Sequence, residues 1–182
     1  MFKCVKPTIP AINNSVESKE DSKDVQKDTQ EEIKSEIFNV AGKSNVVPEV
    51  CEYYLSNINV TKRIQPSIIN TSSSYYDVKN EGNIYIDLIL CVNSLNNQDK
   101  MADDIISTKM KINNNEYKCF SLVETADGSN LEKNASIKHL ETRKIHYVAE
   151  VPIKDSTGEL EITLTINGRN FSNKFDLEGM KS

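Results

Sequence analysis

Residues 159–176, ELEITLTINGRNFSNKFD, are the stretch that decides the fold class. In the first half, Leu or Ile alternates with Glu or Thr, and this period of two predicts a strand with one buried face. Asn167 and Gly168 follow at once, and both residue types tolerate positive φ, which is the strongest short signal of a hairpin. We therefore expect two antiparallel strands, with Phe171 and Phe175 on the inner face of the second strand.

The same alternation recurs along the rest of the chain at roughly ten-residue spacing, as in all-β sandwiches. Further strands are expected at residues 55–64, 83–93, 106–112, 117–123 and 145–151. The only helical turn that we expect lies near residues 99–104. The pattern predicts an all-β fold, an antiparallel β-sandwich of about seven to nine strands in two sheets.

Charge divides the 182-residue chain into two parts. Residues 15–36 hold eight acids and four lysines, whereas the 146 residues after them hold 19 acids and 16 bases. The acidic stretch has only three aliphatic residues, which bury too little apolar surface to offset the entropy of ordering it. We predict a disordered or weakly helical charged linker over residues 1–47 and the sandwich over residues 48–182.

Composition excludes several classes of function. The formal net charge is -5 and no basic block occurs, which argues against nucleic acid as the main partner. No apolar run approaches the roughly 18 residues of a membrane-spanning helix. No glycine-rich phosphate loop is present, and the four cysteines form no C-x-x-C pair for zinc or redox chemistry. We therefore expect no cofactor.

Three strand sequences resemble a family of bacterial extracytoplasmic immunoglobulin-like, or telokin-like, domains of unknown function. They are residues 57–61, residues 85–95 and residues 144–152, of which the second closes on Asn93 and the third on Pro152. The resemblance covers roughly residues 50–178. It implies an immunoglobulin-like sandwich of the kind found on Gram-positive lipoproteins and secreted antigens. It implies no activity, because the family has no common catalytic residues.

The N-terminus is compatible with two locations. Cys4 precedes a polar, charged linker, as the lipid-modified cysteine does in mature bacterial lipoproteins, so Cys4 is a candidate lipid attachment site. The residues before Cys4 form neither an apolar signal region nor a cleavage site. We expect an extracellular or cell-surface location, with any membrane contact only through this anchor. A cytoplasmic protein with an ordinary N-terminal tail is the alternative.

Two cysteines lie on predicted strands of the sandwich. Cys91 and Cys119 are candidates for a disulfide, which would stabilise the fold by about 2–4 kcal/mol. The alternative, which we favour, is that each is a small buried apolar side chain. Cys51, at the domain edge, would pair with either or with neither.

Catalytic residues are not predicted. A Ser-His or Cys-His arrangement would have to use His139 or His146, the only two histidines. His146 alternates with apolar neighbours, which places it on the solvent face of its strand, and His139 lies in a polar stretch. Neither is close to a known nucleophile signature.

One loop carries oxygen ligands of the type that calcium prefers. The candidates are Asn96, Asp99, Asp103 and Asp104. Their spacing matches no EF-hand, so we favour a solvated loop at a sheet edge over a metal site.

The leading hypothesis is therefore a non-enzymatic binding or structural module, tethered to or secreted from a Gram-positive cell, that meets a protein or cell-wall ligand. The alternative is a small secreted hydrolase or an accessory domain of one, which requires a concave pocket holding His139 or His146 beside a carboxylate. A weaker alternative is a calcium-stabilised adhesion module.

Overall fold

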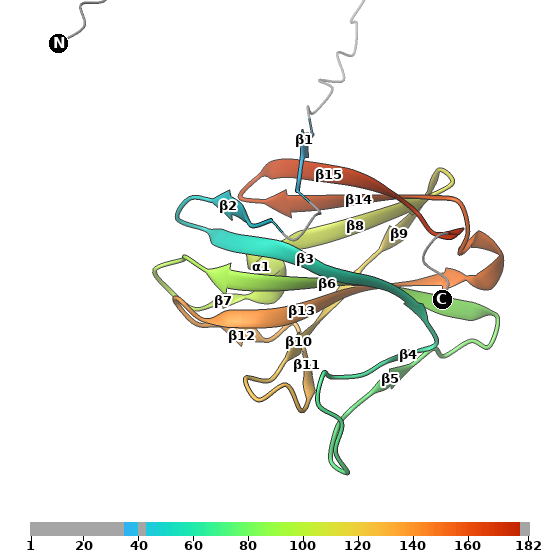
Figure 1. The fold of residues 1–182 in the computed structure, drawn as a ribbon, viewed down its shortest axis with the longest axis horizontal. Helices are drawn as coiled ribbons and strands as arrows, with labels where there is room; N and C mark the ends of the chain where they lie inside the picture. The colour runs from blue at the N-terminus through green and yellow to red at the C-terminus, as the bar shows by residue number, and fades with distance from the viewer. Residues whose placement is uncertain (1–34, 40–42, 179–182) are drawn as a thin grey trace, which may run out of the picture. The chain divides into compact units, whose positions relative to one another are not determined.

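The computed structural model describes residues 35–39 and 43–178, which fold as a β-sandwich (Figure 1). A five-stranded and a six-stranded sheet form two stacked layers, so the predicted all-β class is confirmed. Eleven strands in the described residues belong to these sheets, and eight of them have four or more residues. The predicted seven to nine correspond to these eight, because the short edge strands carry too few residues to show a period.

The five-stranded sheet has the order β1-β15-β14-β8-β9. Its strands are β1 (Glu36–Ile37), β15 (Arg169–Asp176), β14 (Glu159–Ile166), β8 (Ser107–Ile112) and β9 (Asn115–Lys118). All neighbours are antiparallel except β1 and β15, which run parallel.

The six-stranded sheet has the order β11-β10-β13-β6-β3-β2 and is antiparallel throughout. Its strands are β11 (Leu131–Lys133), β10 (Phe120–Glu124), β13 (Thr142–Pro152), β6 (Asn83–Ser94), β3 (Cys51–Thr61) and β2 (Asn45–Val47). Strands β6 and β13 pair from Asn83–Pro152 to Asn93–Thr142, which is the whole of β13 and all of β6 except Ser94.

Four short strands make two small ribbons outside the main sheets. They are β4 (Arg63–Ile64) with β5 (Tyr76–Asp77), and β7 (Lys100–Met101) with β12 (Ser136–Ile137). A single helical turn, α1 (Ala102–Ile105), lies in the predicted place, and a 3-10 turn follows β13 at Ile153–Asp155. Among the described helices, none combines the length and apolar character needed to cross a bilayer.

The predicted hairpin is confirmed. Ile166 pairs with Arg169, and Asn167 and Gly168 between them have φ of 49° and 75°. Leucine and isoleucine on the inner face of β14 are fully buried, and Phe171 opposite Leu164 is 8% exposed. The local turn chemistry therefore sets the register that buries the apolar face.

One predicted strand is divided between the two sheets. Residues 117–123 were expected to return beside residues 106–112, but only β9 does so, pairing with β8. After Cys119 the chain enters the other layer, where β10 pairs with β13. The alternation of apolar and polar residues does not reveal this change of sheet, because strands of either sheet alternate in the same way.

The sandwich begins earlier than residue 48. The main core is the cluster of buried apolar side chains that both sheets contribute. Phe38 is 1% exposed in this core, and its ring centroid lies 6.3 Å from that of Phe175. Val47 on β2 is also buried, and β1 pairs with β15. The predicted boundary therefore falls too late, because a two-residue strand and one anchoring aromatic give no periodic signal. The charged residues before 35 lie outside the described residues.

Candidate functional site

A segment that we call the strap, residues 63–78, crosses the face of the six-stranded sheet that points away from the main core. It contains β4 and β5, which project below that sheet in Figure 1. Ile64 of the strap and four apolar side chains of the sheet form a second, smaller core; the four are Tyr85, Leu122, Leu131 and Val148. The strap therefore covers side chains on a sheet face that would otherwise meet solvent.

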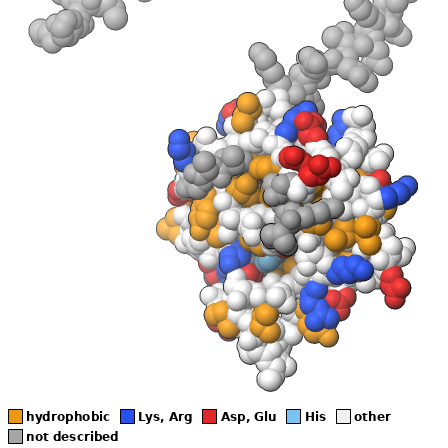
Figure 2. Space-filling model, turned by 45° about the vertical axis from the view of Figure 1, so that its right-hand side comes forward, with side chains coloured by type: hydrophobic (Ala, Val, Ile, Leu, Met, Phe, Trp, Pro, Cys, Tyr) orange, Lys and Arg blue, Asp and Glu red, His pale blue; other side chains and the backbone are white. Residues whose placement is uncertain are grey.

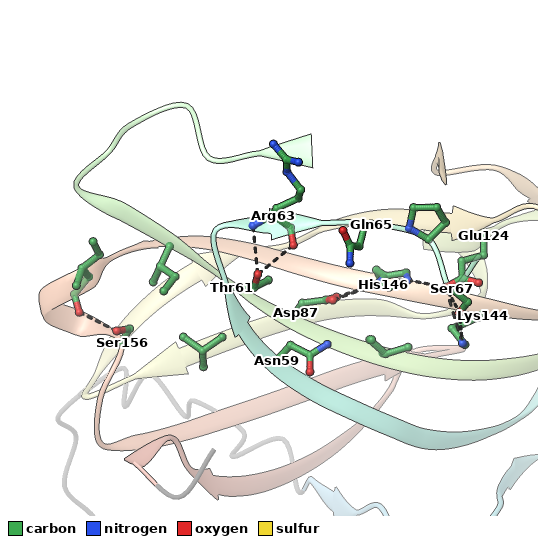
Figure 3. Close-up of a pocket in the computed structure, with 15 residues that line it drawn as sticks. Asn59, Thr61, Arg63, Gln65, Ser67, Asp87, Glu124, Lys144, His146 and Ser156 are labelled. Carbon is green, nitrogen blue, oxygen red and sulfur yellow. Dashed lines mark hydrogen bonds and ion pairs between the residues drawn. The ribbon is translucent and has the colours of Figure 1, made fainter. Parts of the chain in front are cut away.

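Beside this small core, the strap and the sheet line an open cavity of about 660 Å³, which we call the polar cavity (Figure 3). Strands β3, β6, β10 and β13 and the strap all contribute to its wall. Its polar lining is Asn59, Thr61, Arg63, Gln65, Ser67, Asp87, Glu124, Lys144, His146 and Ser156. Its volume lies within the range of pockets that hold small ligands.

His146 lies in the wall of the cavity between two buried carboxylates. Its Nδ1 is 3.0 Å from Asp87 Oδ2, and its Nε2 is 3.1 Å from Glu124 Oε1. The three residues are only 3–4% exposed. The prediction of a solvent-facing His146 is therefore wrong. The alternation correctly turned the ring away from the main core, but the strap, distant in sequence, covers that face.

Opposing effects act on the ionisation of His146. Burial lowers its pKa because a charged ring is poorly solvated there, while hydrogen bonds and attraction from Asp87 and Glu124 raise it. The carboxylates prevail, and the pKa of His146 lies above its ordinary value of 6.5. The site thus favours the imidazolium, which carries a proton on each nitrogen.

Glu124 links this cluster to the strap. The Ser67 hydroxyl donates to Glu124 Oε1 over 2.8 Å, and the Lys144 ammonium donates to Ser67 Oγ and lies 3.8 Å from Glu124 Oε1. Further along the strap, the Ile68 amide donates to the Gly128 carbonyl, in the loop that follows β10. The same carboxylate therefore contacts a sheet histidine and a strap hydroxyl.

At the rim of the cavity, Arg63 forms a two-point ion pair with Asp77, with N–O distances of 2.6 and 2.8 Å. Its guanidinium also lies 4.1 Å from the centre of the Tyr75 ring. These groups are half exposed, so the pair itself contributes little to stability. They place a cationic and an aromatic surface beside the cavity mouth.

The predicted metal ligands do not converge. Asn96 donates its side-chain amide to the Val50 carbonyl, and Asp99 is exposed in the loop after β6. Asp103 and Asp104 are exposed on α1. In the described residues, no group of three or more histidines, cysteines and acids is arranged to hold a metal ion.

The cysteines of the sandwich are free thiols. Cys119 packs against the main core, whereas Cys91 alternates with inward residues of β6 and lies on the strap side of the sheet. The structure therefore contains no bond between Cys91 and Cys119. Burial raises the pKa of Cys51 and of Cys119 to about 12, as expected of small buried side chains. Cys4 lies outside the described residues.

His139 is separate from the cavity. It is exposed, and its Nδ1 lies 2.6 Å from the Asn96 carbonyl oxygen. Only one of the two histidines therefore meets the requirement that a histidine lie in a pocket beside a carboxylate.

Sequence reasoning did not select Asp87 or Glu124 as site residues. Asp87 interrupts an otherwise apolar run in the strand expected at residues 83–93, and a charge that such a strand buries needs a partner. That signal was available, but it does not identify the partner. Glu124 lies at the end of a predicted strand and looks like any surface acid.

On the face of the described residues that Figure 2 shows, no large patch carries a single sign of charge. Lysine and arginine side chains are interspersed there with acidic ones, and apolar side chains lie between them. This agrees with the nearly balanced charge of residues 37–182.

Comparison with known proteins identifies the fold. No protein-family model matches the chain, and neither does any curated protein. Among solved structures, an uncharacterised β-sandwich protein from Clostridium difficile superposes with a TM-score of 0.70 at 20% identity, over 81% of this chain and 98% of that one. At this identity the likeness shows the β-sandwich alone.

Two weaker structural matches come from Bacillus species. A "putative lipoprotein" of Bacillus subtilis gives a TM-score of 0.45 at 14% identity, over 78% of this chain and 40% of that one. A conserved hypothetical protein of Bacillus anthracis gives 0.47 at 12% identity, over 73% and 93%. These scores are too low to carry an argument about this chain.

Proposed function

We propose that this protein is a non-enzymatic ligand-binding module with an immunoglobulin-like sandwich, working outside a Gram-positive cell, and that the polar cavity is its ligand site. The observation that carries the proposal is the lining of the cavity. Charged side chains rarely lie buried unless they are paired, and here a paired cluster lies in the wall of an accessible cavity. A polar ligand, such as a cell-wall glycopeptide, matches this lining.

The geometry of His146 supports binding over catalysis. In a hydrolase of the serine-histidine type, one ring nitrogen meets the orienting carboxylate and the other meets the nucleophile. Here both nitrogens meet carboxylates, and the Ser67 hydroxyl donates to Glu124. An imidazolium held in this way has no lone pair with which to accept a proton from a nucleophile.

The extracytoplasmic location is supported by the resemblance of residues 50–178 to extracytoplasmic domains and by the charged stretch that precedes the sandwich. Fractionation of cells expressing the full-length gene tests it. We expect the protein in the medium, wall or membrane fraction, and recovery from the cytosol alone would overturn this part of the proposal.

Ligand binding is tested by sedimentation with purified Gram-positive peptidoglycan as the probe. Gln65→Trp places a large ring at the cavity, while Lys111→Trp adds the same ring on the exposed face of β8. We expect wild type and Lys111→Trp to sediment with the peptidoglycan and Gln65→Trp to remain in solution. Equal sedimentation of the two variants would contradict the assignment of the site.

The same samples test the hydrolase alternative. We expect no soluble sugar or peptide fragments above a protein-free control. Fragment release that His146→Ala abolishes would show an enzyme and overturn the non-enzymatic assignment.

A further inference from the structure

We propose that the His146 imidazolium holds the strap against the sheet at the edge of the polar cavity, and that loss of its proton as pH rises releases Glu124 and loosens the strap. The inference rests on the proposed function in one respect: the strap controls ligand access only if the cavity is the ligand site. The movement of the strap itself depends on no ligand.

With both carboxyl groups ionised, the geometry requires two protons on the ring. Nδ1 and Nε2 lie 3.0 and 3.1 Å from oxygens of two different carboxylates, one on β6 and one on β10. A carboxylate oxygen only accepts, so each nitrogen must donate, which neutral imidazole cannot do at both positions. Deprotonation therefore brings a lone pair against a buried anion at one of the two contacts.

The contact that breaks is the one to Glu124. Among the described residues, His146 is the only side chain that donates to the Asp87 carboxylate, whose loss would leave a buried charge unpaired. Glu124 still has a counter-charge without the ring, because the Lys144 ammonium lies 3.8 Å away and is one-third exposed. Neutral His146 thus keeps its proton on Nδ1, and Glu124 turns toward Lys144 and solvent.

Movement of Glu124 reaches the strap through Ser67. The Ser67 hydroxyl contacts both Glu124 and Lys144, and the next residue, Ile68, bonds to the loop after β10. The charged groups around His146 are Asp87 from β6, Glu124 from β10, Lys144 from β13 and Arg63 from the strap, while β3 presents the uncharged Asn59 and Thr61. Only Glu124 touches both the ring and the strap.

The direction of the effect follows from linkage. The pKa of His146 is higher in the folded protein than the 6.5 of an unfolded chain. The imidazolium contacts therefore contribute fully below pH 6.5, and their contribution is lost as pH rises through the folded pKa. The strap is accordingly held against the sheet below pH 6.5 and loosened above the folded pKa of His146.

The test is an NMR titration of the ligand-free protein from pH 5 to 10. Ring ¹⁵N shifts report the protons on His146, and amide protection factors of Ile68 and Ser74, whose N–H groups bond the loop after β10, report the strap. We expect both ring nitrogens to be protonated at pH 6. The protection factors of the strap amides should fall about tenfold as pH passes the midpoint of the His146 titration. This change is at the low end of what a hydrogen bond to a charged group contributes.

Three variants separate the steps. Ser67→Ala, an exposed change, should give low strap protection that no longer depends on pH, while His146 still titrates above 6.5. His146→Gln should also abolish the pH dependence, and if it fails to fold, Ser67→Ala carries the test. His139→Gln removes the exposed histidine that contacts only a carbonyl, and should behave as wild type.

A single proton on the His146 ring at pH 6 would overturn the inference. So would strap protection that stays constant while His146 titrates. Failure of peptidoglycan sedimentation would overturn the proposed ligand but leave this ligand-free measurement intact, so the two failures are distinguishable.

Discussion

Replacing Phe38 by alanine should destabilise the protein by about 3–5 kcal/mol, the usual cost of removing a buried aromatic ring. The ring is 1% exposed and packs against Phe175 in the main core. Complete burial of such a ring removes about 150–250 Å² from water. At about 25 cal/mol per Å², this gives roughly 4–6 kcal/mol before relaxation of the site.

The assay is urea unfolding followed by circular dichroism. With an m value of about 2 kcal/mol per molar urea, the midpoint of Phe38→Ala should fall by about 1.5–2.5 M. The adjacent Ile37 supplies a matched control, since its side chain is 83% exposed. Ile37→Ala should change stability by no more than about 0.5 kcal/mol.

Equal midpoints for the two variants would refute the reasoning. They would mean that residues 35–39 contribute no ring to the core and that the sandwich begins after them. A large loss for Phe38→Ala alone would establish that the domain includes a segment whose composition resembles a linker.

Three further outcomes are expected. Gly158→Ala should destabilise by about 1–3 kcal/mol in urea unfolding, because φ is +90° and the new Cβ would lie 2.6 Å from a neighbouring amide oxygen. Asp87→Asn should lower the pKa of His146, measured by NMR, because burial still lowers this pKa while the carboxylate that raises it most is lost. The free energy of unfolding should fall by about 3–5 kcal/mol at pH 6 and by less above the wild-type His146 pKa. Cys51 and Cys119 each have a pKa of about 12, so only about one thiol in 10⁴ is ionised in the folded protein at pH 8. Both should therefore resist iodoacetamide until urea unfolds the protein.

Each of these predictions has a control or a contrary outcome. Gly168→Ala meets no atom within 4 Å, so it should cost less than Gly158→Ala, and the reverse order would contradict the clash. A His146 pKa that stays unchanged in Asp87→Asn would show that Glu124 alone sets it. Rapid alkylation of Cys51 or Cys119 in the folded protein would contradict their burial.

The strands of the sandwich were predictable where apolar and polar residues alternate, because such alternation marks a strand with one buried face. The hairpin at Asn167 and Gly168 is the clearest case, because turn chemistry and alternation agree. The division of residues 117–123 between the two sheets was not predictable, since the alternation of a strand does not say which layer it joins. The same limitation hid β1, whose pairing with β15 depends on residues more than 130 positions away.

The candidate site was predictable only in parts. Alternation placed His146 on the face opposite Ile145, and Asp87 is an acid in an otherwise apolar strand, although it was not selected. Neither observation shows that the strap would bury that face. The cluster of Asp87, Glu124 and His146 forms because β6, β13 and β10 are adjacent in the sheet, an order that differs from their order in the sequence.

The sequence by itself determined the all-β class, the main hairpin and the inward face of each long strand, because these depend on neighbours a few residues apart. The tertiary structure alone decided where the sandwich begins, that residues 63–78 cover a second face, and that a histidine meets two carboxylates beside a cavity. Burial of a charged group depends on everything that packs around it, and those partners come from four separate segments of the chain. The net charge of the domain gave no hint of this cluster, because a sum over the sequence does not record which charged side chains are buried together.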